Sequence, residues 1–178
     1  MKTELLLPAG KPESLRAAVA NGADAVYLGG NMYGARANAG NFDESEMRSA
    51  VKLCKKHHVG LYVTMNTLVS DSEMAEALDY AKFLYDIGID GLIVQDIGLA
   101  GAIKTLLPAL RLHGSTQMTI HNVRGAKWAR DFGFKRVILS RELTLKEIQM
   151  IHDAVPELEL EVFCHGALCI CYSGQCLM

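Results

Sequence analysis

The sequence has no surplus of charge of either sign. It contains 18 lysine and arginine residues against 20 aspartate and glutamate residues, so the formal net charge is only -2. No overall positive field attracts nucleic acid or an anionic membrane surface, and such a partner would need a local patch. Proline is scarce as well, with 4 residues, and together with 16 glycines this excludes a collagenous or low-complexity chain.

Long apolar runs are also missing. No stretch approaches the ~20 apolar residues of a membrane span, and the apolar run near the start is far shorter than that of a secretory signal. Hydrophobic residues nevertheless make up 50% of the sequence, which is enough for one packed core. The length of 178 residues is too short for two full-sized domains. We therefore expect residues 1–178 to form a single domain of a cytoplasmic protein with no membrane partner.

Short segments rich in valine, isoleucine, leucine and tyrosine alternate with longer segments of helical spacing. A helix is expected after each strand except the last, for example from Pro12 toward Gly22 and from Met74 onward. Ser70 with Glu73, and Thr144 with Glu147, have capping-box spacing. The seven predicted strands are residues 4–7, 25–28, 61–64, 91–94, 110–113, 136–139 and 158–163.

This alternation predicts right-handed crossovers and a parallel sheet, either an open doubly wound sheet or a barrel. No G-x-G-x-x-G follows the first strand, whereas polar residues follow nearly every strand, as in barrel enzymes. We therefore predict an α/β fold, a TIM-like βα barrel. At roughly 26 residues per unit, eight units need about 208 residues. The barrel is expected to be incomplete, part of a longer parent protein, with open strand edges that could allow self-association.

Four polar side chains near the predicted strand ends form the predicted substrate-binding set. Arg36 could clamp a carboxylate or phosphate, or could pair at the surface. His113 could shuttle a proton, or could be a structural hydrogen-bonding group. Ser115 could orient a ligand or cap the following helix, and Asn66 follows the third strand.

Three further residues form the predicted catalytic set. Glu161 lies on the last strand, where burial would raise the pKa of its carboxyl group. His165 could move protons, and Gln117 could donate a hydrogen bond to a ligand or cap a helix. Arg141 and Glu142, in contrast, are expected to pair with one another in solvent.

Five cysteines are present, and four of them lie in the last fifteen residues. The isolated one, Cys54, is predicted to be a small buried hydrophobic residue of a helix. The others could form disulfides, could hold zinc together with His165, or could ligate an iron–sulfur cluster. A reducing compartment and the lack of paired C-x-x-C spacing favour the cluster. The four clustered residues are Cys164, Cys169, Cys171 and Cys176.

The tail of the chain reads Glu161-Val-Phe163-Cys-His-Gly166-Ala167-Leu168-Cys169, then four residues, then Gly174-Gln-Cys176-Leu-Met178. It resembles the motif of the collagenase-like peptidase family U32, which runs Glu-x-Phe-x-x-Gly-Ser/Ala-aliphatic-Cys-x4-Gly-x-Cys-x-aliphatic-Ser. Every fixed position up to the last residue here matches. The resemblance extends to the opening of the chain and to its middle. The matching segments are residues 161–178, 7–10, 22–29, 36 with 41–42, and 115–117.

The resemblance implies a barrel-like catalytic domain and, in several members, a 4Fe-4S cluster held by four cysteines. Two of these ligands correspond to Cys169 and Cys176, and the other two would follow the motif. Cys164 and Cys171 are not motif positions. We therefore expect the isolated chain to hold no cluster and to be inactive.

Two activities are implied by the resemblance. One is proteolysis; the other is oxygen-independent hydroxylation of a transfer or ribosomal RNA base, with prephenate as hydroxyl donor, or of a related aromatic substrate. The sequence contains no H-E-x-x-H or G-x-S-x-G motif. A cysteine protease using Cys164 or Cys169 with His165 stays open, as does a purely scaffolding role. A cluster suits the redox task, so hydroxylation is the favoured hypothesis, with RNA or a small aromatic acid as partner and a protein substrate as the alternative.

Overall fold

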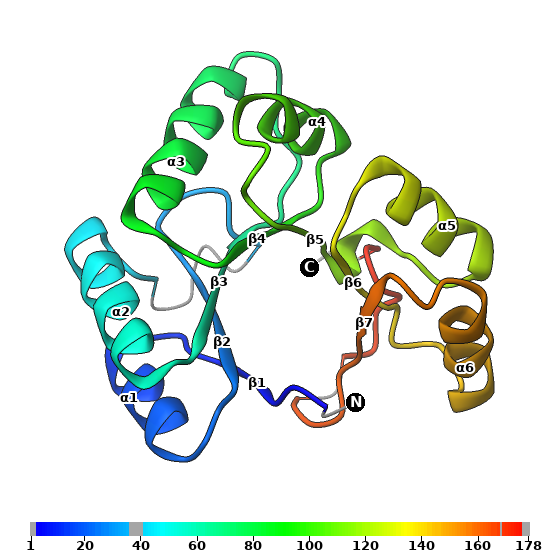
Figure 1. Ribbon diagram of the computed structural model, residues 1–178. Helices are drawn as coiled ribbons and strands as arrows, with labels where there is room; N and C mark the ends of the chain where they lie inside the picture. The colour runs from blue at the N-terminus through cyan, green and yellow to red at the C-terminus, as the bar shows by residue number, and fades with distance from the viewer. Residues whose placement is uncertain (1–2, 36–40, 168, 176–178) are drawn as a thin grey trace. The chain divides into compact units, whose positions relative to one another are not determined.

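The computed structural model describes residues 3–35, 41–167 and 169–175. Strands and helices alternate along the chain, as the colours of Figure 1 show. The chain divides into two compact units, Met1–Leu110 and Arg111–Met178, which are described in turn.

Unit 1 contains four parallel strands, and each strand is followed by a helix. The strands pair in chain order, so that every crossover joins neighbouring strands. The strands are β1 (Leu6–Pro8), β2 (Ala25–Gly29), β3 (Gly60–Met65) and β4 (Gly91–Val94). The helices are α1 (Pro12–Ala20), α2 (Glu44–His57), α3 (Met74–Ile87) and α4 (Ile97–Leu106).

The strands of unit 1 have two different faces. Leu28, Val63 and Leu92 stand side by side in the register, and all three are at most 2% exposed. Figure 1 shows the helices lying along one side of these strands. The row of Leu28, Val63 and Leu92 gives the helices an apolar surface on which to pack. The alternate residues face the other way and include polar ones. Among them, the Tyr62 hydroxyl donates to the Glu4 carboxylate over 3.4 Å.

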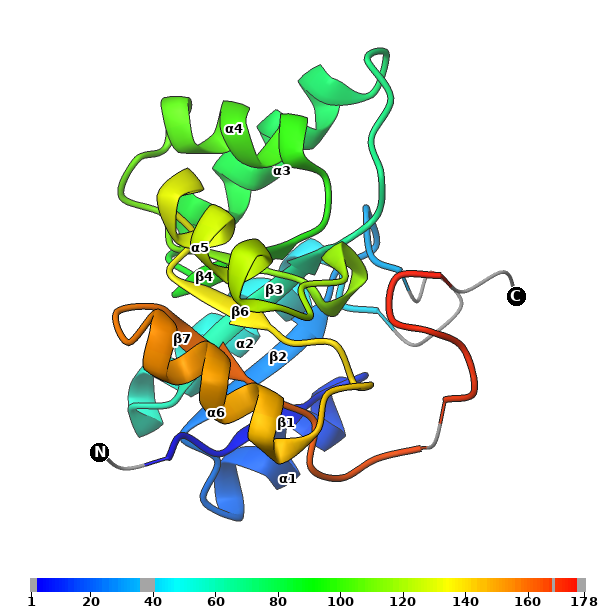
Figure 2. The same ribbon diagram turned by 90° about the vertical axis from the view of Figure 1, so that its right-hand side faces the viewer.

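Unit 2 contains three parallel strands in the order β5-β6-β7. The register aligns His113 with Arg136 and Arg136 with Glu159, so these three residues share one face. After β7 the chain continues through residues 162–167 and 169–175 without helix or strand, as the orange-to-red segment of Figure 2 shows. The elements are β5 (Leu112–Gly114), the short 3₁₀ helix η1 (Thr116–Met118), α5 (Val123–Phe132), β6 (Arg136–Ile138), α6 (Leu145–Ala154) and β7 (Glu159–Glu161).

Local signals in the sequence set several element boundaries. Helix α1 begins at Pro12, and Gly22 beyond its end adopts the left-handed conformation with φ of 86°. Thr144 and Glu147 form the predicted capping box of α6. At the other predicted box, the Glu73 carboxylate accepts from the Ser70 backbone over 2.9 Å, but α3 begins later and Glu73 itself is the N-cap.

Four strands are shorter than predicted: the first, fifth, sixth and seventh, at Leu6–Pro8, Leu112–Gly114, Arg136–Ile138 and Glu159–Glu161. Cys54 is buried in α2 as predicted, and burial, with a smaller contribution from Asp90, raises the pKa of its thiol to about 11. In the part of the chain that the structure describes, every helix is too short or too polar to cross a membrane.

Candidate active site

The cysteine-bearing tail contacts the loops that follow β5 and β6, and Ser173 is the centre of these contacts. The Ser173 side chain is wholly surrounded by protein, with the residue only 1% exposed. Its backbone N–H donates to Glu142 Oε1 over 2.8 Å, and its carbonyl accepts from the Thr119 hydroxyl over 2.8 Å. Its hydroxyl accepts from the Arg141 backbone N–H over 3.1 Å. The tail therefore lies at the carboxyl ends of β5 and β6.

Gly174 follows Ser173 and fits against η1 because it has no side chain. Its φ of 76° lies in the left-handed region, and a Cβ atom there would stand 2.5 Å from the Gln117 carbonyl oxygen and still closer to the Thr119 hydroxyl. The glycine of the family motif is thus required both by backbone conformation and by close approach.

Arg141 binds the tail with its side chain. Its Nε donates to the Ser173 hydroxyl over 3.2 Å, Nη2 donates to the Cys171 carbonyl over 2.7 Å, and Nη1 donates to the Cys169 carbonyl over 3.5 Å. The prediction that Arg141 and Glu142 pair with one another is therefore replaced by a different arrangement. Both residues bind the tail, because the tail brings backbone donors and acceptors to the loop after β6.

Cys169 is exposed, and its surroundings lower the pKa of its thiol. A backbone hydrogen bond from Cys171, followed by the Arg141 guanidinium, lowers the pKa of the Cys169 thiol. A thiolate is the form that binds soft metals such as iron. Among residues 3–35, 41–167 and 169–175, however, no group of three or more His, Cys, Asp or Glu side chains could hold a metal ion. Cys169 is the described cysteine that matches a ligand position of the family motif, and a complete ligand set would require further residues.

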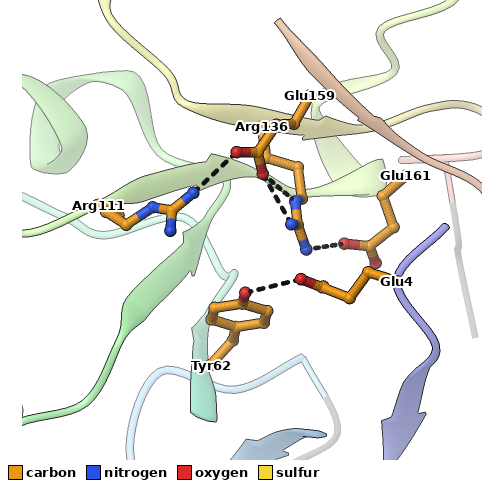
Figure 3. Close-up of polar contacts among 6 residues, drawn as sticks. All are labelled: Glu4, Tyr62, Arg111, Arg136, Glu159 and Glu161. Carbon is orange, nitrogen blue, oxygen red and sulfur yellow. Dashed lines mark hydrogen bonds and ion pairs between the residues drawn. The ribbon is translucent and has the colours of Figure 1, made fainter. Parts of the chain in front are cut away.

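A second polar group lies on the face of β5, β6 and β7 that the register defines. Arg136, whose side chain is 9% exposed, donates to Glu159 Oε2 from Nε over 2.9 Å and from Nη2 over 2.7 Å. Arg111 binds the other oxygen of Glu159 over 2.8 Å. Figure 3 shows the Arg136 guanidinium between the carboxylates of Glu159 and Glu161, whose Oε2 lies 3.6 Å from Nη1. The buried guanidinium is thus compensated by carboxylates on the neighbouring strand.

His113 belongs to the same face and is fully buried. Burial, with further contributions from the positive charges of Arg136 and Arg111, lowers the pKa of His113 to about 3. The imidazole is therefore neutral at physiological pH. Of the predicted residues, the structure brings His113 and Glu161 together around Arg136.

Two other predicted residues belong to η1 and its N-cap. Ser115 is 2% exposed and caps η1, since its hydroxyl accepts from the Gln117 backbone N–H over 3.2 Å. The Gln117 carbonyl lies against Gly174. His165 is exposed and has no hydrogen-bond or ion-pair partner within the described ranges.

The remaining predicted residues lie elsewhere. In unit 1, the Asn66 side chain accepts from the Ala35 backbone N–H over 3.0 Å and so holds the loop after β2. Arg36 and Cys176 lie outside the described residues.

Sequence reasoning named Glu161 but missed its partner Arg136, and it also missed Arg111 and Glu159. Arg136 and Glu159 lie at predicted strand positions, and a charged residue inside an apolar strand was the signal that could have drawn attention to them. Nothing in the sequence around Arg141 or Ser173 indicates that they meet, because 32 positions separate them.

The fold and site together define an α/β protein of the TIM-like βα class, with a cysteine segment at the carboxyl ends of its strands. A solved U32 peptidase supports this fold, with a TM-score of 0.74 over 90% of this chain and 68% of that chain at 16% identity. The chain matches the peptidase family U32 over residues 10–178, and it belongs to that family. The resemblance seen in the tail motif and the predicted fold class are both confirmed.

Curated relatives carry names of two kinds. The chain is 42% identical over 175 residues to a 23S rRNA 5-hydroxycytidine synthase of Escherichia coli, a match that covers 98% of this chain and 26% of the relative. It is 40% identical over 177 residues to a tRNA hydroxylation protein of Bacillus subtilis, covering 99% of this chain and 42% of the relative. It is 29% identical over 186 residues to a collagenase of Porphyromonas gingivalis, covering 98% of this chain and 44% of the relative. The chain thus spans less than half the length of these relatives.

Proposed function

We propose that the chain is part of an iron–sulfur enzyme that hydroxylates a base of ribosomal or transfer RNA without molecular oxygen. The names of the Escherichia coli and Bacillus subtilis relatives support the reaction and the RNA substrate. The observation that carries the proposal in this structure is the state of Cys169. Its thiol has a lowered pKa and lies on a segment bound at the carboxyl ends of β5 and β6, which is where barrel enzymes place their chemistry.

The proposed cofactor is a 4Fe-4S cluster, which would supply the redox chemistry. Cys169 and Cys176 would be two of its ligands, and the other two would come from elsewhere in the whole protein. Cys169 suits this role because it is exposed and the pKa of its thiol is lowered, which raises the share of thiolate relative to a free cysteine. The role of the chain itself would be to present its two cysteines at a fixed place.

A small aromatic acid such as prephenate is the proposed hydroxyl donor, and Arg36 is the proposed binder of its carboxylates. The net charge of -2 gives this chain no strong attraction for RNA. Contacts to RNA are therefore proposed to come largely from the remainder of the whole protein, which would act in the cytoplasm.

Proteolysis is the second candidate, supported by the name of the Porphyromonas gingivalis relative. A cysteine peptidase needs a thiolate beside an imidazole. Among the described residues, Cys169 is bound by Arg141 and Cys171, whereas His165 is exposed and has no partner. This arrangement favours a ligand cysteine over a nucleophilic one.

The proposed function can be tested with a matched pair of cysteine variants. The gene for the full-length protein is deleted in its host and is then replaced by wild type, by Cys169→Ala or by Cys54→Ala. Nucleosides from digested ribosomal and transfer RNA are measured by mass spectrometry. The wild type should restore a pyrimidine that carries one extra oxygen atom, and Cys169→Ala should lower its amount at least tenfold. Cys54→Ala should restore it, because Cys54 is buried with its thiol pKa at about 11.

Two further measurements separate the candidate reactions. The purified full-length protein, kept free of oxygen, should contain iron and sulfide, and Cys169→Ala should lose them. Gelatin hydrolysis is assayed on the same preparations. Gelatin cleavage by the wild type, combined with an RNA nucleoside profile that does not change on deletion, would replace the hydroxylation proposal by the peptidase one.

A further inference from the structure

The cysteine segment, residues 169–175, has no secondary structure of its own to hold it in place. It contains no helix or strand, so it lacks the ladder of backbone hydrogen bonds that orders most chain segments. Ordering each residue of such a segment costs backbone entropy. A few specific contacts must offset this cost, and these contacts determine where Cys169 lies.

The contacts converge on two adjacent residues of the loop after β6. Arg141 donates to the hydroxyl of Ser173 and to the carbonyls of Cys171 and Cys169, and thus reaches every second residue of the segment. Glu142 accepts the backbone N–H of Ser173 over 2.8 Å. Burial opposes ionisation of Glu142, but donors from Ser173 and from its own backbone lower the pKa of this carboxyl overall.

The shape of arginine explains why one side chain can do this. The guanidinium carries its donors in a planar fork, so Nε, Nη1 and Nη2 can each meet a different acceptor. A lysine ammonium also has three donors, but all of them lie on one nitrogen and lack the fixed planar fork, so it would match these separate acceptors less well. Hydrogen bonds from a charged donor are also about twice as strong as neutral ones.

We infer that Arg141 and Glu142 are positioning residues, which fix the cysteine segment on the carboxyl ends of β5 and β6 and thereby set the place of Cys169. Neither residue belongs to the cysteine motif of the tail. Their effect on cofactor binding rests on the function proposed above, whereas the binding of the segment itself rests on the contacts alone.

The test uses full-length protein that is purified without oxygen. The wild type is compared with the variants Arg141→Gln and Arg141→Lys and with the control variant Arg124→Gln. Arg124 is exposed on α5 and does not contact the cysteine segment. Amide hydrogen exchange of peptides covering residues 169–175 reports how firmly the segment is bound. Arg141→Gln should speed this exchange at least about tenfold, since one charge-assisted hydrogen bond accounts for roughly that factor. Arg141→Lys should restore only part of the protection, and Arg124→Gln should match the wild type.

Iron content and the electronic spectrum distinguish a positioning role of Arg141 from a general stabilising one. Loss of a residue that only stabilises the fold would change neither of them. Arg141→Gln should lower the iron per chain or change the cluster spectrum, while exchange in α5 and α6 stays as in the wild type. Unchanged exchange at residues 169–175 in Arg141→Gln would overturn the inference. So would faster exchange with iron content and spectrum that stay those of the wild type.

A milder variant addresses the possibility that Arg141→Gln fails to fold. Ser173→Ala removes only the hydroxyl that accepts from Arg141, and leaves the backbone of Ser173 to bind Glu142 and Thr119. It should speed exchange of the segment by a smaller factor than Arg141→Gln. If the wild type itself binds no iron, the proposed function fails, and the exchange measurements still decide whether Arg141 holds the segment.

Discussion

His113 shows how the surroundings of a single residue limit its chemistry. Its side chain is fully buried on β5, and burial together with Arg136 and Arg111 lowers its pKa from the ordinary value of 6.5 to about 3. It is therefore neutral throughout the physiological range, which suits a hydrogen-bonding role better than proton transfer near neutral pH.

The low pKa of His113 predicts a specific dependence of stability on pH. Between about pH 6.5 and pH 3 the unfolded chain binds a proton at this residue and the folded chain does not, so the free energy of unfolding falls as the pH falls. The contribution of His113 to the free energy of unfolding is complete above pH 6.5, the pKa of histidine in the unfolded chain. It is lost as the pH falls toward 3, the pKa of His113 in the folded chain. His113→Gln should flatten the fall, which for one group is at most about 1.4 kcal/mol per pH unit.

The measurement is urea unfolding of wild type and variant at several pH values in that window. His152→Gln is the control, since His152 is exposed on α6. A His113→Gln protein with the same pH slope as the wild type would show that His113 binds its proton in the folded state too.

At the scale of elements, the contact between the tail and η1 depends on one glycine. Gly174 has a φ of 76° and lies against the Gln117 carbonyl and the Thr119 hydroxyl. Gly22, after α1, has a similar φ of 86° but has no atom within 4 Å of the place of a Cβ. The two glycines thus share a backbone conformation and differ in their surroundings.

This difference predicts the effect of adding a methyl group. Gly174→Ala should detach the cysteine segment, and hydrogen exchange at residues 169–175 should rise at least about tenfold, because rigid backbone atoms block the added carbon. Gly22→Ala should cost only the strain of a left-handed alanine, about 1 kcal/mol of unfolding free energy, and should leave exchange at the tail unchanged. Equal effects of both variants on tail exchange would contradict the close contact seen at Gly174.

At the scale of the whole molecule, the strand order of the sheet begins with β1 and ends with β7. β1 pairs with β2, and the preceding Leu5 is 45% exposed. β7 pairs with β6. Unpaired strand edges with exposed apolar side chains promote association between chains.

We expect the chain of residues 1–178 to self-associate, so that its average mass in sedimentation rises with concentration. Leu5→Lys should reduce this association, because a charge beside an edge strand opposes pairing. Leu106→Lys is the control, since Leu106 is 62% exposed at the end of α4. A reduction of the same size by Leu106→Lys would indicate general surface hydrophobicity in place of edge pairing.

Much of the architecture could be predicted because its causes are local. Apolar periodicity located seven strands, and the cap at Thr144 and the glycine at position 22 marked helix ends that the structure confirms. Strand ends were less accurate, because the seventh strand stops at Glu161 where its pairing with β6 stops, although its apolar pattern continues to Phe163.

The candidate site was predicted less completely, because its contacts join distant residues. Ser115 and Gln117 were identified by their place after a strand; Ser115 caps η1, and the Gln117 carbonyl lies against Gly174. Arg141 and Glu142 were assigned to each other because they are neighbours. Their partner Ser173 lies in a segment with no regular pattern, so nothing local indicates the contact.

The sequence by itself determined the order of strands and helices and the family. These follow from periodic burial and from a motif whose spacing is continuous in the chain. Only the tertiary structure decided that Arg141 holds the segment of Cys169, and that His113 is neutral beside Arg136. The reason is physical: hydrogen bonds and charges act through space over a few ångströms, and the distance between residues is set by the folded backbone and not by their order along the chain.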